Sequence, residues 1–220
     1  MSEIRWDLLT IGHLSRNKFW GEADDRAYRS PLCTSVLIRT GTMAIVVDPS
    51  LPPDGMGPLL DRRAGLSILD VDAVFLTHFH GDHRFGIDAF PEAEWLMAGE
   101  EISAWRDKLP QDYDDRRVLE RLKTTRGELA PDIALLATPG HTLNHHSLVF
   151  ESEGMRVVVA GDAVMTRDFF RERDYYFNTA DPEAAVRSIE EIAATADVIV
   201  PGHDNYFINR LSVTDAKESL

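Results

Sequence analysis

The sequence predicts an α/β fold in which two β-sheets pack together and helices cover the outside. Two observations lead to this expectation. Short apolar runs rich in Val, Ile and Leu, bounded by Gly, Pro and Asp, recur along the chain, and such runs are typical of strands. They fall into two groups, each followed by helical patterns, which favours two layered sheets with outer helices. With 220 residues, 44% of them hydrophobic, the chain is expected to form a single domain over residues 1–220.

The predicted strands are short, and two turns join pairs of them. The expected strands are residues 6–11, 35–39, 44–48, 73–77, 94–97, 133–138, 147–150, 156–160 and 198–200. The stretches 39–43 and 151–155 each contain a Gly between two such runs. They therefore predict hairpin turns.

Helical patterns are fewer, and one of them is well marked. We expect helices at residues 56–64, 100–108, 114–124 and 182–195. The last has Asp181 at its N-cap, Pro182 at its first position and apolar residues at helical spacing. The charged segment 106–131 is expected to be a helical connection between the two halves.

Composition excludes several classes of function. The net charge of −14 repels phosphate backbones, so we expect no nucleic-acid partner. The single cysteine, Cys33, rules out an intrachain disulfide and a thiolate zinc cluster. The sequence shows no signal peptide and no apolar run long enough to span a bilayer. It therefore predicts a cytoplasmic protein that does not bind membranes.

Four of the predicted strands end at potential metal ligands. The strand at 73–77 runs into His78-Phe79-His80-Gly81-Asp82-His83, and the other three run into His141, Asp162 and His203. Strand ends can converge on one rim of a β scaffold. Any one of these residues alone could be an ordinary turn, cap or core residue, but their joint placement favours a metal site.

The mixture of side chains suits two divalent ions. Neutral imidazoles bind Zn²⁺ or Fe²⁺ well, and a carboxylate can bridge two cations. His78 and His80 can hold one ion, whereas Asp82 and His83 can serve a second. With His141, Asp162 and His203 the set reaches seven ligands. We expect two divalent metal ions that share Asp162, with Zn²⁺ favoured and Fe or Mn as alternatives.

The run from His78 to His83 resembles the H-x-H-x-D-H signature of the metallo-β-lactamase fold superfamily, and the later ligands follow in that family's order. The resemblance implies an αββα sandwich with the metals at one edge. It implies that His78, His80 and His141 hold the first ion, that Asp82, His83 and His203 hold the second, and that Asp162 bridges. Asp48 matches an outer acid of the family, although a simple turn residue before Pro49 is an equal alternative.

Within that family the chain is most similar to the N-acyl homoserine lactone lactonase and glyoxalase II-like branch. The resemblance rests on His141-Thr142 followed by His145 and Ser147, on Asp162-Ala163, on Asp181-Pro182-Glu183 and on Gly202-His203-Asp204. The chain departs from the lactonases at Met165, where those enzymes have a substrate-contacting tyrosine. Tyr175 or Tyr176 is a candidate replacement. The roles of His13, His145 and His146 stay open.

These patterns predict a metal-dependent hydrolase of a small ester, lactone or thioester. A metal-bound hydroxide would attack the carbonyl, and Asp82 or Asp162 would relay the proton. The alternatives are a mononuclear iron persulfide dioxygenase and a metal-dependent phosphodiesterase or nuclease of the same fold. The expected partner is a small-molecule substrate, and a homodimer is an open alternative.

Overall fold

The computed structural model describes residues 4–110 and 114–209, and it contains two six-stranded sheets. The first sheet has the order β1-β2-β3-β4-β5-β6, with strands β1 (Arg5–Leu8), β2 (Val36–Arg39), β3 (Ala44–Val47), β4 (Ala73–Leu76), β5 (Glu94–Ala98) and β6 (Lys123–Thr125). The second has the order β12-β11-β10-β9-β8-β7, with strands β7 (Glu128–Ala130), β8 (Ile133–Ala137), β9 (His146–Ser152), β10 (Met155–Gly161), β11 (Val198–Pro201) and β12 (Phe207–Ile208).

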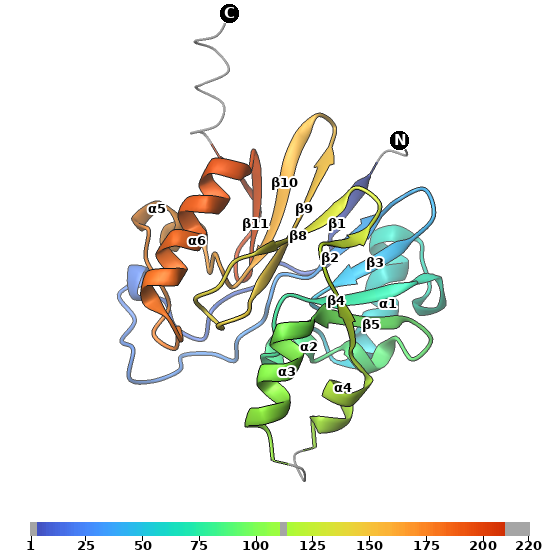
Figure 1. Ribbon diagram of the computed structural model, residues 1–220, viewed down its shortest axis with the longest axis horizontal. Coiled ribbons are helices and arrows are strands. Elements are labelled where there is room, and N and C mark those ends of the chain that lie inside the picture. Colours follow the sequence, from blue (N-terminus) through green and yellow to red (C-terminus); the bar gives the residue numbers. More distant parts are fainter. Residues whose placement is uncertain (1–3, 111–113, 210–220) are drawn as a thin grey trace, which may run out of the picture.

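The helices lie outside the two sheets (Figure 1). They are α1 (Pro53–Ala64), α2 (Gly81–Arg84), α3 (Gly99–Lys108), α4 (Arg116–Arg121), α5 (Arg167–Glu172) and α6 (Pro182–Thr195). Three single turns of 3₁₀ helix are η1 (Lys18–Trp20), η2 (Ile68–Asp70) and η3 (Ile87–Ala89). No helix of the described residues is both long enough and apolar enough to cross a membrane.

Strand periodicity sorts the apolar side chains into three layers of core. In β3, Ile45 and Val47 face the second sheet, whereas Val46 faces the helices of its own half. Successive side chains of a strand point to opposite faces, so a fully apolar strand is expected where both faces are covered. The layer between the sheets also contains Phe75 from the first sheet and Val159 from the second. The result is the predicted αββα sandwich.

Both sheets combine parallel and antiparallel pairs. Strands β3, β4, β5 and β6 run parallel to one another, and so do β10 and β11. The predicted hairpins are confirmed, because Arg39 pairs with Ala44 and Ser152 pairs with Met155 in antiparallel ladders. Parallel neighbours end at the same edge of a sheet, and this brings the ends of β3 and β4 together, and those of β10 and β11.

All nine predicted strands are present, and helix α6 has the predicted bounds and cap, with the Asp181 side chain accepting a hydrogen bond from the Ala184 N–H at 3.0 Å. The prediction for residues 114–124 was wrong at its C-terminal end. Helix α4 stops at Arg121, and Lys123 already pairs with Leu96 of β5. The connection 106–131 is therefore partly extended, since it supplies the edge strands β6 and β7. Residues 111–113 lie outside the described part of the chain.

Candidate metal centre

The candidate ligands lie at the ends of four strands, as the sequence predicts. His78, His80, Asp82 and His83 follow β4, with the last two in the short helix α2. His141 lies in the loop after β8, Asp162 follows β10, and His203 follows β11. A side chain at position 202 would collide with this arrangement, because a Cβ on Gly202 would lie 2.1 Å from Asp162 Oδ1. Glycine is thus required where β11 brings its ligand beside that of β10.

The loop that carries His141 depends on another glycine. Gly140 has φ +141°, and a Cβ there would lie 2.3 Å from the backbone nitrogen of Ala185. The Ser188 hydroxyl donates to the Pro139 carbonyl at 2.7 Å, and the Asp181 N–H donates to the Gly140 carbonyl at 2.9 Å. Close approach to α6 therefore fixes the loop, and with it the position of His141.

The first group of converging side chains consists of His78, His80, His141 and Asp162. His80 Nδ1 lies 2.9 Å from His78 Nε2 and 2.9 Å from His141 Nε2. Asp162 Oδ2 lies 3.1 Å from His141 Nε2 and 3.8 Å from His78 Nε2. Three ring nitrogens and one carboxylate oxygen thus face one small volume.

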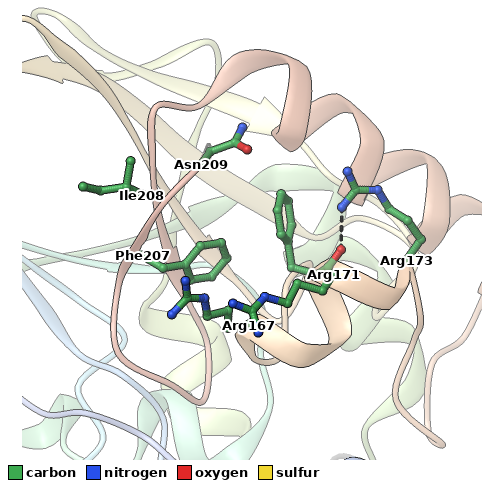
Figure 2. A pocket seen from close by; sticks show the side chains of 7 residues that line it. Arg167, Arg171, Arg173, Phe207, Ile208 and Asn209 are labelled. Atoms are coloured by element: carbon green, nitrogen blue, oxygen red, sulfur yellow. Dashed lines mark hydrogen bonds between the residues drawn. The ribbon is translucent and has the colours of Figure 1, made fainter. Parts of the chain in front are cut away.

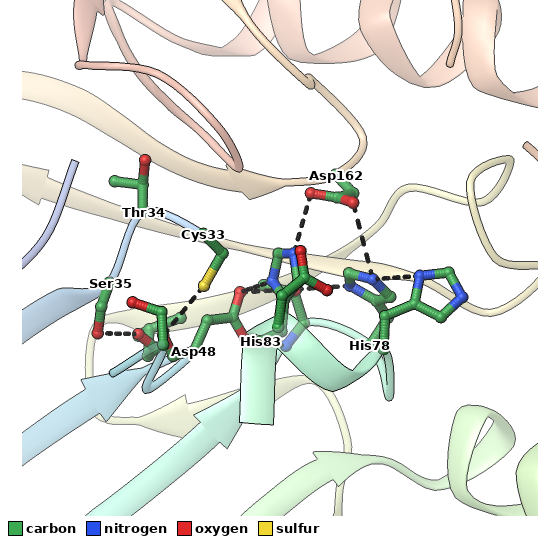
Figure 3. Close-up of polar contacts among 12 residues, drawn as sticks. Cys33, Thr34, Ser35, Asp48, His78, His83 and Asp162 are labelled. Atoms are coloured by element: carbon green, nitrogen blue, oxygen red, sulfur yellow. Dashed lines mark hydrogen bonds and ion pairs between the residues drawn. The ribbon is translucent and has the colours of Figure 1, made fainter. Parts of the chain in front are cut away.

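The second group consists of Asp82, His83 and His203. His203 Nε2 lies 3.6 Å from Asp82 Oδ2. The other oxygen of Asp162, Oδ1, lies 3.1 Å from His83 Nε2 and 3.2 Å from His203 Nε2. Asp162 therefore contacts both groups, one through each carboxylate oxygen. Figure 3 shows dashed lines from Asp162 toward His78 of the first group and His83 of the second.

Hydrogen bonds on the outer side of the rings determine which nitrogens face the centre. The Nδ1–H of His83 donates to Asp48 Oδ2 at 2.9 Å, and the Nδ1–H of His203 donates to the Leu32 carbonyl at 2.9 Å. In a neutral imidazole only one nitrogen carries a proton. Nε2 of each ring is therefore the nitrogen that faces the centre, and in the neutral ring its lone pair is free to bind a metal.

His78 is oriented in the same way, through Thr77. Asp48 accepts from the Thr77 N–H at 2.9 Å and from the Thr77 hydroxyl at 2.8 Å. Since that hydroxyl proton is used, Thr77 Oγ1 accepts from His78 Nδ1, 3.1 Å away. Nε2 of His78 is then the free acceptor as well. Asp48 is 1% exposed, so this outer shell is shielded from water.

Burial and charge act differently on the two groups of candidate ligands. Burial lowers the pKa of His141 to about 3, although the Asp162 carboxylate opposes the shift. Burial raises the pKa of Asp162, but the charges of His83, His203 and His141 more than offset this and hold it well below its usual value. The pKa values of His83 and His203 are instead raised, because the attraction of nearby acidic groups, Asp162 among them, outweighs burial. Neutral imidazole and ionised carboxylate are the forms that bind divalent cations, so an ion bound at the second group would displace these protons.

The donor set fits divalent metal ions. Among the described residues, His83 Nε2 and Asp162 Oδ1 are buried without a hydrogen-bond partner, although they lie 3.1 Å apart. A lone pair facing a carboxylate oxygen is repulsive unless a cation or proton lies between them, and buried polar atoms rarely stay unpaired. Five imidazoles and two carboxylates match the nitrogen and oxygen ligands that Zn²⁺ and related ions prefer.

The structure places the three open histidines outside both groups. His145 is buried, and its Nδ1 lies 2.9 Å from Thr138 Oγ1. His146 Nδ1 donates to the Asn144 carbonyl at 2.9 Å, and His13 contributes its carbonyl, 3.2 Å from His203 Nδ1. Thr77 is not among the residues that the sequence predicts for the site. Its position between a strand and the first ligand was the available signal.

Of the two candidate tyrosines, Tyr176 has its hydroxyl held away from the ligands. Tyr176 donates to the Arg16 carbonyl at 3.2 Å and accepts from the Ser15 hydroxyl at 2.9 Å. Tyr175 is 41% exposed. Met165 is buried in a small cluster with Leu14, Phe169 and Tyr176. Tyr176 therefore does not replace the tyrosine that the lactonase resemblance leads us to expect at position 165, because its hydroxyl is held by the loop that contains Ser15.

Comparison with known protein families identifies the superfamily of this chain. Residues 31–203 match the family described as the metallo-beta-lactamase superfamily. The chain belongs to this superfamily. Its two mixed sheets and outer helices are the fold of that family, as a solved quorum-quenching N-acyl homoserine lactone lactonase shows. That structure has a TM-score of 0.70 at 24% identity, with 94% of this chain and 98% of the other covered.

Two curated relatives show what this superfamily member is similar to. Metallo-beta-lactamase domain-containing protein 1 of Xenopus laevis is 33% identical over 175 residues, which cover 77% of this chain and 70% of the relative. An N-acyl homoserine lactonase of Bacillus thuringiensis is 32% identical over 152 residues, which cover 65% of this chain and 60% of the lactonase. Family membership together with lactonase relatives indicates a metal-dependent hydrolase with a His/Asp metal site.

Proposed function

We propose that the chain is a dinuclear hydrolase that cleaves a small ester, lactone or thioester. The observation that carries the proposal is the position of Asp162, whose Oδ1 and Oδ2 contact different groups of candidate ligands. A carboxylate so placed can bridge two cations. His78, His80 and His141 would hold one ion, Asp82, His83 and His203 would hold the other, and Zn²⁺ is the ion that this donor set favours.

When bound, the ions supply a nucleophile from water near neutral pH and polarise the carbonyl oxygen. The protein contributes the acid–base groups and the shape of the site. The side chain of Asp82 is 21% exposed, whereas that of Asp162 is 6% exposed. We assign Asp82 Oδ2 to carry the proton between the attacking water and the leaving oxygen or sulfur, because it is the more open of the two carboxylates. Asp162 contacts both groups of ligands and keeps them in position relative to each other.

The substrate class follows from charge and from the lactonase relatives. A net charge of −14 disfavours polyanionic substrates such as nucleic acids, so we propose a small carbonyl compound as the partner. A cytoplasmic location, a single domain over residues 1–220 and a homodimer stay predictions.

A screen of the metal-loaded protein tests the proposal. Lactones, thioesters and phosphodiesters are offered in parallel, with metal content measured on the same sample. We expect hydrolysis of carbonyl substrates and about two ions per chain. Asp82→Asn should lower kcat far more than Asp107→Asn, a matched change on the exposed face of α3. Turnover of phosphodiesters alone would contradict the proposal. So would a single iron with oxygen consumption on a persulfide.

A further inference from the structure

A cavity lies beside α5 and the edge strand β12. Its volume is about 320 Å³, and its lining residues are Arg167, Phe170, Arg171, Arg173, Phe207, Ile208 and Asn209. None of these belongs to either group of candidate metal ligands. Figure 2 shows the arginines on and after α5, with Phe207 and Asn209 on the segment that faces them.

The sequence places the three arginines around this cavity. Arg167, Phe170 and Arg171 stand three and four residues apart in α5, so they share one face of the helix. Arg173 follows at the C-cap with φ +52°, and its guanidinium donates to the carbonyl of Phe170. Local helix geometry thus brings three arginines to the lining of one cavity.

These charges have no acidic partner among the described residues. Elsewhere in the chain arginines pair with acids, as Arg84 does with Asp115 at 2.6 Å and Arg117 with Asp88 at 2.5 Å. No described carboxylate forms an ion pair with Arg167, Arg171 or Arg173. Like charges gathered at one site repel one another. In a protein of net charge −14 such a cluster is a local exception, and an anion would relieve the repulsion.

The floor of the cavity is aromatic. The rings of Phe170 and Phe207 lie 5.2 Å apart at an interplanar angle of 54°, and both residues are buried. The Arg173 guanidinium lies 4.5 Å from the Phe170 ring centre, and that of Arg167 lies 5.7 Å from the Phe207 ring centre. Stacking against a ring holds a guanidinium in place while its N–H groups stay available.

We propose that this cavity binds a small organic oxyanion, a carboxylate or a phosphate monoester with a flat apolar body. The guanidinium N–H groups would bind the oxyanion, for which their fork geometry is suited. The apolar body would lie on Phe170 and Phe207. A volume of about 320 Å³ suits a ligand of one or two fused rings. This site is separate from the metal centre and does not depend on the hydrolase assignment.

Calorimetric titration of the metal-loaded protein tests the proposal with three probes of one shape. 2-Naphthoate and 2-naphthyl phosphate carry the anion, whereas 2-naphthamide is the neutral isostere. We expect saturable binding of at least one anion, with the amide at least tenfold weaker. The tighter of the two anions identifies the source of the oxyanion. Equal binding of the amide, or no binding of either anion, would overturn the proposal.

Variants separate this cavity from the metal centre, which can also attract carboxylates. Arg167→Gln and Arg171→Gln should each weaken anion binding about tenfold, because each removes charge-assisted hydrogen bonds. Arg187→Gln is the matched control, since this exposed arginine lies on α6 and pairs with Glu183. Phe207→Leu should weaken both the anions and the amide. Unchanged affinity in both Arg167→Gln and Arg171→Gln, with wild-type melting temperatures, would place the binding elsewhere and refute the assignment.

Discussion

Replacing Asp48 by Asn tests how the outer hydrogen bonds prepare the metal ligands. The substitution keeps the shape of the side chain and removes one charge. Asp48 has φ +50°, a left-handed conformation that Asn also tolerates. The backbone strain is therefore unchanged, and the effect reports on hydrogen bonding.

The structure determines which way the new amide must point. Oδ1 of Asp48 accepts from the Thr77 N–H, so the amide oxygen has to remain on that side. The amide NH₂ then takes the place of Oδ2, which contacts the Thr77 hydroxyl and His83 Nδ1. As a donor it forces His83 Nδ1 to become an acceptor, so the ring proton moves to Nε2. Thr77 is then free to donate to His78, with the same consequence.

One substitution thus puts protons on the metal-facing nitrogens of two histidines from different groups. Disturbing partners of metal-bound histidines typically costs ~10–100-fold in affinity or activity. Because both groups are affected, we expect weaker binding of both ions, by at least tenfold each. Asp48→Ala should in addition destabilise the fold by about 1–3 kcal/mol for each buried donor left without an acceptor.

Metal competition titrations measure the affinities, and nitrogen chemical shifts of the histidine rings report which nitrogen is protonated. Thr77→Ser keeps the hydroxyl and is expected to behave like wild type, whereas Thr77→Val should weaken only the group that contains His78. An Asp48→Asn protein that binds two ions with wild-type affinity and keeps the proton on His83 Nδ1 would refute the reasoning.

Three further outcomes are expected. Asp162→Ala should abolish stable binding of the metal pair and cost more activity than Asp48→Ala, because Asp162 contacts both groups directly; equal, small losses of bound metal and rate would contradict this. Met165→Tyr should raise N-acyl homoserine lactone turnover if its phenol reaches the developing oxyanion, an interaction worth up to ~2.7–4 kcal/mol. Met165→Phe is the control, because it fills the same buried cluster without the hydroxyl. Equal rates in the two variants would count against the idea. The metal-free protein should lose stability as pH falls below about 6.5, because burial lowers the pKa of four histidines, His141 to about 3 and also His78, His80 and His145. The raised pKa values of His83 and His203 act in the opposite direction, but these two are outnumbered. The unfolded chain then binds more protons than the native one, so stability rises with pH; urea unfolding at pH 7.5 and 5.5 measures it, and His145→Gln should flatten the dependence.

The sequence was informative where physical periodicity is strong. All nine predicted strands are present. The clearest patterns are apolar runs buried on both faces, such as β3 and β4. It failed where elements are short or polar. Strand β6 has the sequence Lys-Thr-Thr and β12 has two residues, so neither carries enough alternation to be recognised. The short helix α5 was missed for the same reason, and with it the arginine-lined cavity.

By itself the sequence determined which side chains are available at the strand ends, because the ligands directly follow apolar runs that must be buried. Only the tertiary structure decided how those ends meet. The distances between His80 and His141, or between Asp162 and His203, depend on the order of strands in two sheets and on the close approach that Gly140 and Gly202 permit. Contacts between residues far apart in the chain leave no local periodic signal. For the same reason, the link from Asp48 through Thr77 to His78 and His83 became visible only in the folded chain.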